Sequence, residues 1–293
     1  MRSGFVTVYG KANAGKSTIV NRILGFKIEA VSERPQTTRD NILGIYNGKD
    51  CQICFIDTPG IFAPHAKLGA NLLRKAENGR RDCDVLLFVF AADEGIDKDI
   101  CQKVSSAGKP VVLAYNKIDK VRADEGENKL AKLVKLLPEG TAVVRLSAKE
   151  GFGVDDVIKA LLERLPEGDR LFPEDLATDR PKEFVYAEFI REKCMRLLRK
   201  EVPHSIFVEI KSVEDDPEGL FIRANIIVER ESEKAIVIGH AGSMISKISK
   251  YSEEALKGFV GKPVGVKLLV KVVPDWRNDV RFLQAHGLSG KGE

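Results

Sequence analysis

A glycine-rich loop directly follows the first apolar segment of the chain. The apolar run Phe5–Tyr9 leads into Gly10–Ser17, which has the spacing G-x-x-x-x-G-K-S, and a helical pattern follows at once. This strand–loop–helix order is typical of a loop whose backbone N–H groups point at a polyphosphate. Lys16 can reach the β- and γ-phosphates, and the Ser17 hydroxyl can bind Mg²⁺. The loop therefore predicts a nucleoside triphosphate ligand. The residues expected to contact it are Gly10, Lys11, Ala12, Asn13, Ala14, Gly15, Lys16, Ser17 and Thr18.

The chain from residue 1 to 165 alternates between strand-like and helix-like segments. Runs such as Val85–Phe90 are apolar throughout, as expected for strands buried on both faces. The alternation predicts a doubly wound, mostly parallel sheet. The expected strands are Gly4–Tyr9, Ile42–Tyr46, Gln52–Ile56, Val85–Phe90, Val111–Tyr115 and Ala142–Leu146. The expected helices lie near Ser17–Gly25, Lys67–Asn78, Lys98–Ala107, Glu127–Leu137 and Val154–Leu165.

Composition narrows the class of protein. The 293 residues suffice for two domains, and 31% charged with 43% hydrophobic residues describes a folded rather than a disordered chain. No leader-like or membrane-spanning segment is evident, so we expect a cytoplasmic protein. The five cysteines are scattered, and Cys51 and Cys54 form a C-x-x-C without a second pair. We expect buried thiols rather than disulfides or a metal site.

Asp57-Thr58-Pro59-Gly60 stands at the end of an apolar strand. A carboxylate in this place can hold Mg²⁺, usually through water, and the backbone N–H of Gly60 can sense a γ-phosphate. Such a string can also be an ordinary turn. Its position after the phosphate-binding loop and an apolar strand favours the functional interpretation.

Asn116-Lys117-Ile118-Asp119 closes another buried strand. The two oxygens of the Asp119 carboxylate match the N1–H and the exocyclic amine of guanine, whereas adenine offers no such pair of donors. Ser147-Ala148-Lys149 follows the next strand and is placed to support the base. We therefore expect GTP rather than ATP, with the base held by Asn116, Lys117, Asp119, Ser147, Ala148 and Lys149.

A polar stretch, Pro35–Asp40, separates the first helix from the second strand. A threonine there can complete the Mg²⁺ shell only when γ-phosphate is present, which makes an order–disorder switch. We favour Thr38 over Thr37. With Lys16 and Gly60, Thr38 forms the expected catalytic set, and with Ser17 and Asp57 it forms the expected Mg²⁺ set.

Ile61 follows the Asp57–Gly60 string, where many GTPases carry a glutamine that orients the attacking water. Isoleucine cannot hydrogen-bond water. Three explanations are open: very slow intrinsic hydrolysis, water held by another group, or help from a monovalent cation or a partner. The amide oxygen of Asn13 can ligate K⁺ beside the phosphates, or Asn13 can simply cap the loop. Our hypothesis is slow hydrolysis accelerated by K⁺.

The pattern changes after residue 165. A connector with three prolines, Leu165–Pro181, precedes segments in the order α-β-β-α-α-β. These are a helix at Glu183–Lys200, strands at Ile206–Val213 and Leu220–Val228 around the acidic turn Glu214–Gly219, two helices, and a strand at Val264–Val273.

The string Val237–Ile245 has the form I-G-x-x-G-x-x-I between two helical segments. A G-x-x-G loop of this kind lets the backbone approach single-stranded nucleic acid, as in KH domains, and the following helix offers its N-terminus. Between Lys234 and Arg281 the chain has nine Lys and Arg against four Asp and Glu, which suits a phosphate backbone. The expected RNA-binding residues are Ile238, Gly239, His240, Ala241, Gly242, Ser243, Lys247 and Lys250.

Together these residues resemble the Era family of bacterial GTPases, from Phe5 to about Leu288. Beyond the nucleotide motifs, the resemblance rests on Leu165–Gly168, Phe172–Asp175, Ile190–Lys193, Val202–Ser205, Val237–Ile245 and Val272–Arg277. It implies a P-loop NTPase G domain, α/β and doubly wound, followed by an α+β type II KH domain. We expect the G domain at 1–166, a linker at 167–182, and the KH domain with a C-terminal tail at 183–293.

The resemblance also implies Mg²⁺-dependent GTP hydrolysis, binding near the 3′ end of small-subunit ribosomal RNA, and a role in maturation of the 30S subunit. Family members are cytoplasmic and partly associated with the inner membrane, and we expect a monomer. Ala12 and Ala14 replace the usual proline and valine, and His240-Ala241 replaces a pair that typically carries lysine. These changes put the strength of nucleotide and RNA binding in doubt, but not the chemistry.

Two other functions are compatible with the sequence. In the first, the second domain of the GTPase contacts protein rather than RNA. In the second, suggested by Ile61, the chain is a nucleotide-dependent binding protein with negligible turnover. A small-molecule kinase is disfavoured, because Asn116–Asp119 selects guanine and no acceptor pocket is evident.

Overall fold

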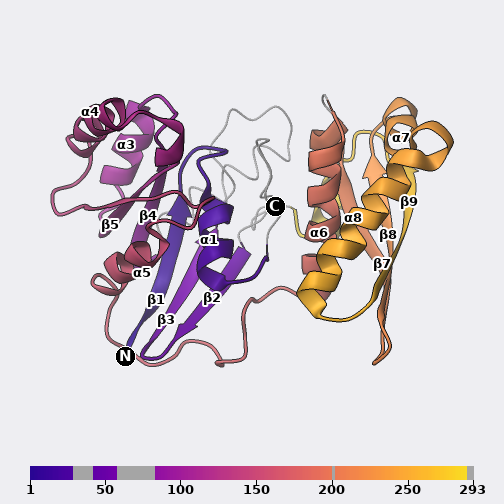
Figure 1. Cartoon of the computed structure of the whole chain (residues 1–293), viewed down its shortest axis with the longest axis horizontal. Coiled ribbons are helices and arrows are strands. Elements are labelled where there is room, and N and C mark those ends of the chain that lie inside the picture. The colour runs from indigo at the N-terminus through magenta and orange to yellow at the C-terminus, as the bar shows by residue number, and fades with distance from the viewer. Residues whose placement is uncertain (29–41, 58–82, 200–201, 289–293) are drawn as a thin grey trace.

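The computed structural model describes residues 1–28, 42–57, 83–199 and 202–288. Two separate sheets organise the molecule, one with six strands and one with three. Figure 1 shows them as two domains joined by an extended segment. The helix expected at Lys67–Asn78 and the polar stretch Pro35–Asp40 lie outside the described residues.

The six-stranded sheet has the order β2-β3-β1-β4-β5-β6, with β2 antiparallel to β3 and every other pair parallel. The expectation of a doubly wound, mostly parallel sheet is thus confirmed. Each expected strand is present with slightly shifted ends. The strands are β1 (Arg2–Tyr9), β2 (Ile42–Gly48), β3 (Cys51–Asp57), β4 (Val85–Ala91), β5 (Val111–Asn116) and β6 (Ala142–Arg145).

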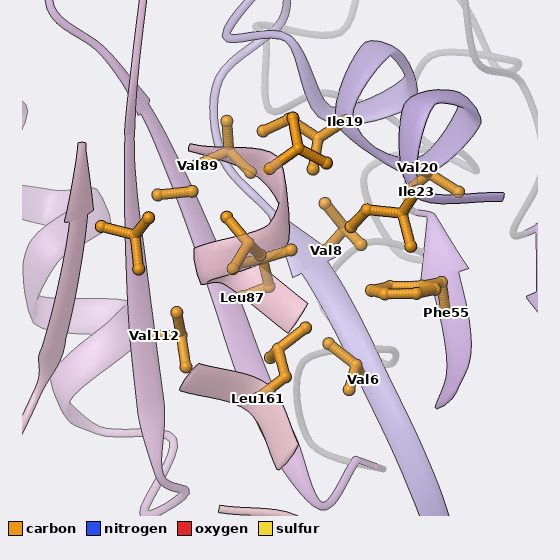
Figure 2. Packing of buried hydrophobic residues seen from close by; sticks show 14 of the residues in the cluster. Val6, Val8, Ile19, Val20, Ile23, Phe55, Leu87, Val89, Val112 and Leu161 are labelled. Atoms are coloured by element: carbon orange, nitrogen blue, oxygen red, sulfur yellow. The ribbon is translucent and has the colours of Figure 1, made fainter. Parts of the chain in front are cut away.

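Helices cover both faces of this sheet. An apolar core lies between the sheet and the helices on each face. One core contains side chains of α1 (Lys16–Leu24) and α5 (Val154–Leu162), and the other contains side chains of α3 (Lys98–Ser105) and α4 (Ala123–Val134). Figure 2 shows the first core, where Ile19 and Ile23 of α1 lie over Val8 and Phe55 of the sheet. Because β4 contributes side chains to both cores, all of its residues are buried, which explains its unbroken apolar run.

Helix α4 starts at Ala123, earlier than the Glu127 expected from the sequence. Arg122 has an extended backbone and ends the preceding loop, and Asp124 and Glu125 occupy the first turn. Acidic side chains there are stabilised by the N-terminal end of the helix dipole. The apolar periodicity begins only one turn later, so a prediction based on that periodicity places the start of the helix too late.

The second domain has the expected order of elements. They are α6 (Lys182–Leu197), β7 (Phe207–Asp215), β8 (Leu220–Val228), α7 (Glu231–Ile238), α8 (Ser243–Val260) and β9 (Val264–Val272), with a short 3₁₀ helix, η2 (Val202–Ser205), before β7. The sheet order is β7-β8-β9, with β8 antiparallel to β7 and parallel to β9. Strand β7 extends through Asp215, so the acidic turn begins at Asp216 and not at Glu214 as predicted.

The face of this sheet that points away from α6 and α8 is partly covered by the C-terminal segment. Trp276 is fully buried beside Ile227, Leu283 and Leu288. Its indole N–H donates to the carbonyl oxygen of Ser205 at 2.8 Å. Leu283 lies on α9 (Val280–Ala285), a helix that the sequence did not predict, and Asp279 caps its start. Its six residues are too few to show a helical period.

All five cysteines are buried free thiols, as expected. Burial raises the pKa of Cys54 and of Cys194 to about 12. Within the described ranges, no helix has the length and apolar character needed to cross a membrane.

Candidate nucleotide and nucleic-acid sites

The loop Gly10–Ser17 connects β1 to α1, and two of its glycines are required by its geometry. Gly10 has φ 153°, and a Cβ there would lie 2.3 Å from the carbonyl oxygen of Val89. Gly15 has φ 102°, and a Cβ there would lie 2.2 Å from Nδ2 of Asn116. Any side chain at either position would collide with its neighbour, so the loop can hold this close turn only with glycine.

Side chains at the start of α1 fit a phosphate and a metal ion. Lys16 is buried, and its ammonium donates to the carbonyl oxygens of Gly10 and Lys11 at 3.2 and 3.0 Å, across the mouth of the loop. The Ser17 hydroxyl donates to Oδ2 of Asp57 at 2.7 Å. The other carboxylate oxygen, Oδ1, is buried without a hydrogen-bond partner among the described residues.

A buried carboxylate with one oxygen unsatisfied is stable only if a cation or water completes it. Ser17 and Asp57 therefore fit Mg²⁺, the metal expected from the sequence. Elsewhere in the described part of the chain, no group of three or more His, Cys, Asp or Glu side chains is arranged to hold a metal.

Asn116, at the end of β5, joins the phosphate-binding loop to the loop after β6. Its side-chain N–H donates to the carbonyl oxygen of Ala14 at 2.8 Å, and its Oδ1 accepts from the backbone N–H of Ala148 at 3.0 Å. Asn116 and Ala148 are both buried. The structure thus brings together three motifs that lie up to about 130 residues apart in the sequence.

Lys117 and Asp119 lie beside this junction. Lys117 adopts a left-handed backbone with φ 61°, and its ammonium lies 3.4 Å from Oδ1 of Asp93. Asp119, in the 3₁₀ helix η1 (Ile118–Lys120), is exposed, so its carboxylate is accessible to a base. The Ser147 hydroxyl accepts from the backbone N–H of Glu150 at 3.3 Å and shapes the loop that carries Lys149.

An ion pair and two acids with shifted pKa values lie beside the phosphate-binding loop. Lys11 pairs with Asp97, the N-cap of α3, at 3.3 Å. Although burial opposes it, hydrogen bonds from the Ile100 N–H and from Lys11 lower the pKa of Asp97. Burial raises the pKa of the neighbouring Glu94 despite Lys117 and Lys11. An ionised carboxylate at the start of α3 thus holds Lys11 of the loop in an ion pair.

Arg22 contacts the candidate site, although the sequence did not predict this contact. It lies in the last turn of α1, and its guanidinium donates to the carbonyl oxygen of Lys149 at 2.9 Å. This contact joins the loop at 147–149 to the helix that follows the loop Gly10–Ser17. A basic residue at the end of a helix is ordinary, so the sequence carried no signal for this role.

Several expected site residues lie outside the described residues: Thr38, Thr58, Pro59, Gly60 and Ile61. Asn13 is described, and its side chain is exposed on a left-handed backbone with φ 64°. Ala14 is fully buried in the core under α1. The alanine at this position is therefore a packing residue as well as part of the loop.

The G-x-x-G loop joins α7 to α8 through the 3₁₀ helix η3 (His240–Gly242). Gly239 and Gly242 have φ 73° and 76°. A Cβ on Gly239 would lie 2.7 Å from the Cβ of Met244, whereas a Cβ on Gly242 would have no atom closer than 4.0 Å. Gly239 is thus required by packing, while Gly242 is required only by its backbone conformation.

The expected RNA-binding side chains surround this loop. His240, Ala241, Ser243, Lys247 and Lys250 are exposed, and Ile238, Gly239 and Gly242 are half-buried. The Lys247 ammonium lies 5.9 Å from the ring centroid of Tyr251, which is 42% exposed. The first turn of α8 has no side-chain cap at Gly242. The start of this helix therefore presents two lysines and an aromatic ring beside the loop.

Two family models match the chain, one in each domain. A family model described as 50S ribosome-binding GTPase matches residues 5–117, and a KH domain model matches residues 201–277. GTPase Era of Thermotoga petrophila is 44% identical over 294 residues, covering 98% of each chain. The chain belongs to the Era family of GTPases. The Era resemblance seen in the sequence is thus confirmed over the full length.

Solved structures of Era support the same fold. Era Y63A of Aquifex aeolicus bound to GDP·AlF4⁻ matches with a TM-score of 0.93 and 40% identity, covering 99% of this chain and 100% of that one. Era in complex with MgGDPNP and nucleotides 1506–1542 of 16S ribosomal RNA also matches with a TM-score of 0.93 and 40% identity, covering 99% of each chain. This chain has a P-loop G domain followed by a KH domain, as expected.

Proposed function

We propose that this chain binds GTP at the loop Gly10–Ser17 and hydrolyses it with Mg²⁺. The observation that carries this proposal is the Asn116 side chain, which bonds both the phosphate-binding loop and the loop at 147–149. This arrangement supports a single site with phosphate contacts on one side of Asn116 and base contacts on the other. Lys16 would hold the β- and γ-phosphates, Ser17 and Asp57 the metal, and Asp119 the guanine.

The remaining assignments rest on the sequence. Thr38 and Gly60 would contact the metal and the γ-phosphate. Hydrolysis would be slow, because Ile61 cannot orient water, and K⁺ bound by Asn13 would accelerate it. The nucleotide set is Gly10, Lys11, Ala12, Asn13, Ala14, Gly15, Lys16, Ser17, Thr18, Asp57, Thr58, Pro59, Gly60, Asn116, Lys117, Asp119, Ser147, Ala148 and Lys149.

The KH domain would bind small-subunit ribosomal RNA near its 3′ end, in assembly of the 30S subunit. The exposed residues His240 and Ala241, and the start of α8 without a side-chain cap, support this role. So does the matching Era structure, which contains nucleotides 1506–1542 of 16S ribosomal RNA. The RNA set is Ile238, Gly239, His240, Ala241, Gly242, Ser243, Lys247 and Lys250.

The test is binding of an RNA oligonucleotide with the 1506–1542 sequence by the full chain and by Gly242→Asp. The added carboxylate would repel phosphate, and the space beside Gly242 is open, so the backbone strain stays local. We expect at least about a tenfold loss of affinity. Gly239→Asp is a poorer test, because its side chain would collide with Met244.

Glu231→Asp, an exposed acidic exchange at the far end of α7, is the control. Unchanged RNA affinity in Gly242→Asp would favour the alternative that this domain contacts protein. Single-turnover hydrolysis with and without the RNA separates a GTPase from a binding protein with negligible turnover.

We also propose the domain limits 1–166, 167–182 and 183–293. The chain would be a cytoplasmic monomer with a fraction at the inner membrane. Co-sedimentation of the full chain with inner-membrane vesicles, and its mass in solution, test these two statements.

A further inference from the structure

The segment between the two domains is bound to the G domain along most of its length. At its start, the backbone N–H of Ser3 donates to the carbonyl oxygen of Pro166 at 3.2 Å, and the N–H of Gly168 donates to that of Met1 at 3.0 Å. Near its end, Gly44 and Thr178 form an antiparallel bridge. The segment therefore runs across the G-domain sheet, from the start of β1 to the edge strand β2.

Gln52 holds the middle of this segment. It is a polar residue in an apolar strand, β3, and its side chain is fully buried. Its Oε1 accepts from the backbone N–H groups of Leu171 and Phe172 at 2.7 and 2.9 Å. Its Nε2 donates to the carbonyl oxygen of Phe172 at 2.9 Å and to Oδ1 of Asn47 at 2.7 Å. One amide thus satisfies three backbone groups of the linker.

Asn47, opposite Gln52 on strand β2, continues the attachment. Its Nδ2 donates to the carbonyl oxygen of Glu174 at 2.9 Å. Two residues earlier, the backbone N–H of Ile45 donates to the carbonyl oxygen of Ala177 at 2.9 Å. The rings of Phe5 and Phe172 meet edge to face at a centroid distance of 6.3 Å.

This attachment leaves little free chain before the KH domain. A free linker from 167 to 182 would reach about 50 Å, but the residues between Thr178 and the first turn of α6 span only about 10 Å. Pro181 further restricts that short connection, with φ −63°. The first helix of the KH domain is therefore tethered to a point on β2.

The same two strands end at the nucleotide site. In the β2–β3 hairpin, Ile42 pairs with Asp57 at one end and Asn47 pairs with Gln52 near the other. Asp57 accepts from Ser17 at the proposed Mg²⁺ site. From Asp57 to Gln52 the hairpin extends about 17 Å as a continuous ladder.

We propose that Gln52 is a positioning residue for RNA binding: by fixing the linker to β2 and β3, it orients the KH domain and lets the nucleotide state set the RNA affinity. The part of this proposal that concerns RNA affinity rests on the proposed function, whereas the part that concerns the orientation of the domains does not. Displacements at the Asp57 end of the hairpin pass through the ladder to the linker because no flexible chain lies between them.

The test compares the full chain with Gln52→Leu, which keeps volume but removes all four hydrogen bonds. Gln102→Leu is the matched control, because Gln102 is exposed on α3, and the hydrogen bonds that attach the linker involve other residues. Spin labels at Lys132→Cys and Lys257→Cys, both exposed, report the distance between the domains. The five native thiols are buried, so the labels are selective.

Wild type and Gln102→Leu should give one narrow distance distribution, and Gln52→Leu a broad one. Affinity for the 1506–1542 RNA oligonucleotide should differ about tenfold between GDP and a non-hydrolysable GTP analogue in wild type, and about twofold or less in Gln52→Leu. Nucleotide affinity should stay unchanged, because Gln52 is remote from Gly10–Ser17.

A narrow distribution in Gln52→Leu overturns the proposal, and so does a broad one with the tenfold difference intact. If wild type binds the RNA with neither nucleotide, the proposed function fails, and the distance distribution still decides whether Gln52 orients the KH domain. If Gln52→Leu does not fold, Asn47→Ala carries both measurements, since it removes the bond to Glu174 from a half-buried side chain.

Discussion

The Lys27 ammonium lies 4.7 Å from the ring centroid of Phe189, so a cation of the G domain rests on an aromatic ring of the KH domain. The same ammonium pairs with Glu192, which is almost fully buried. Lys27 follows α1, and both of its partners lie on α6. This contact is a second connection between the domains, independent of the linker.

Lys27 predicts a pH dependence of stability. Burial, with Lys193 and Arg196 nearby, lowers the pKa of Lys27 from 10.5 to about 7. Between these values the folded chain binds fewer protons than the unfolded chain, so stability rises with pH. From pH 7 to 8.5 we expect Lys27 to contribute a rise of about 1.5 kcal/mol.

Lys27→Met should remove this part of the slope, measured by urea unfolding at several pH values. Glu192 keeps Lys193 at 3.1 Å and Arg196 at 3.2 Å, so no buried charge is left alone in the variant. Lys132→Met, an exposed exchange on α4, should leave the slope unchanged. An identical slope in Lys27→Met and wild type would contradict the prediction.

Asp119→Asn should change the base that the site prefers. The carboxylate would accept from two guanine donors. The amide of the variant keeps one acceptor oxygen and gains an NH₂ group, which can donate to the C2 carbonyl of xanthine. We expect a loss of GTP affinity of about a hundredfold or more and a gain for xanthosine triphosphate, measured by displacement of labelled GDP. Asp124→Asn, exposed on α4, serves as the control. Equal loss for both triphosphates would argue against a direct contact with the base.

Removal of the proposed Mg²⁺-binding carboxylate should raise the Mg²⁺ concentration that GTP hydrolysis requires. Asp57→Asn keeps an oxygen for the Ser17 hydroxyl but loses the charge that offsets a divalent cation. The Mg²⁺ concentration for half-maximal GTP hydrolysis should rise about tenfold or more. GDP binding in excess EDTA should be preserved. Asp50→Asn, exposed in the β2–β3 turn, should match wild type in both measurements.

Asn13→Gly tests the role of K⁺ without straining the loop. Glycine adopts the φ of 64° at this position with less strain than alanine. GTP hydrolysis by wild type should be several-fold faster in K⁺ than in Na⁺, and the two rates should converge in the variant. If wild type itself hydrolyses GTP equally fast in both salts, Asn13 is a loop cap and the cation hypothesis is wrong.

The elements of both domains could be predicted from the sequence because their signals are local. The apolar run of β4 and the glycines of the phosphate-binding loop each act through their own backbone or immediate neighbours. The start of α4 and the six-residue α9 were missed where charge and tertiary burial, rather than periodicity, define the helix. Arg22 was missed because its partner, Lys149, lies 127 residues away.

By itself, the sequence determined that this chain binds a guanine nucleotide and carries a KH domain, since those motifs encode chemistry within a few residues. Only the tertiary structure decided how the domains are joined. Gln52 looks like an isolated polar residue in a strand, and its partner Phe172 is 120 residues further along the chain. A buried amide must find hydrogen-bond partners, but which ones it finds depends on where the folded chain returns.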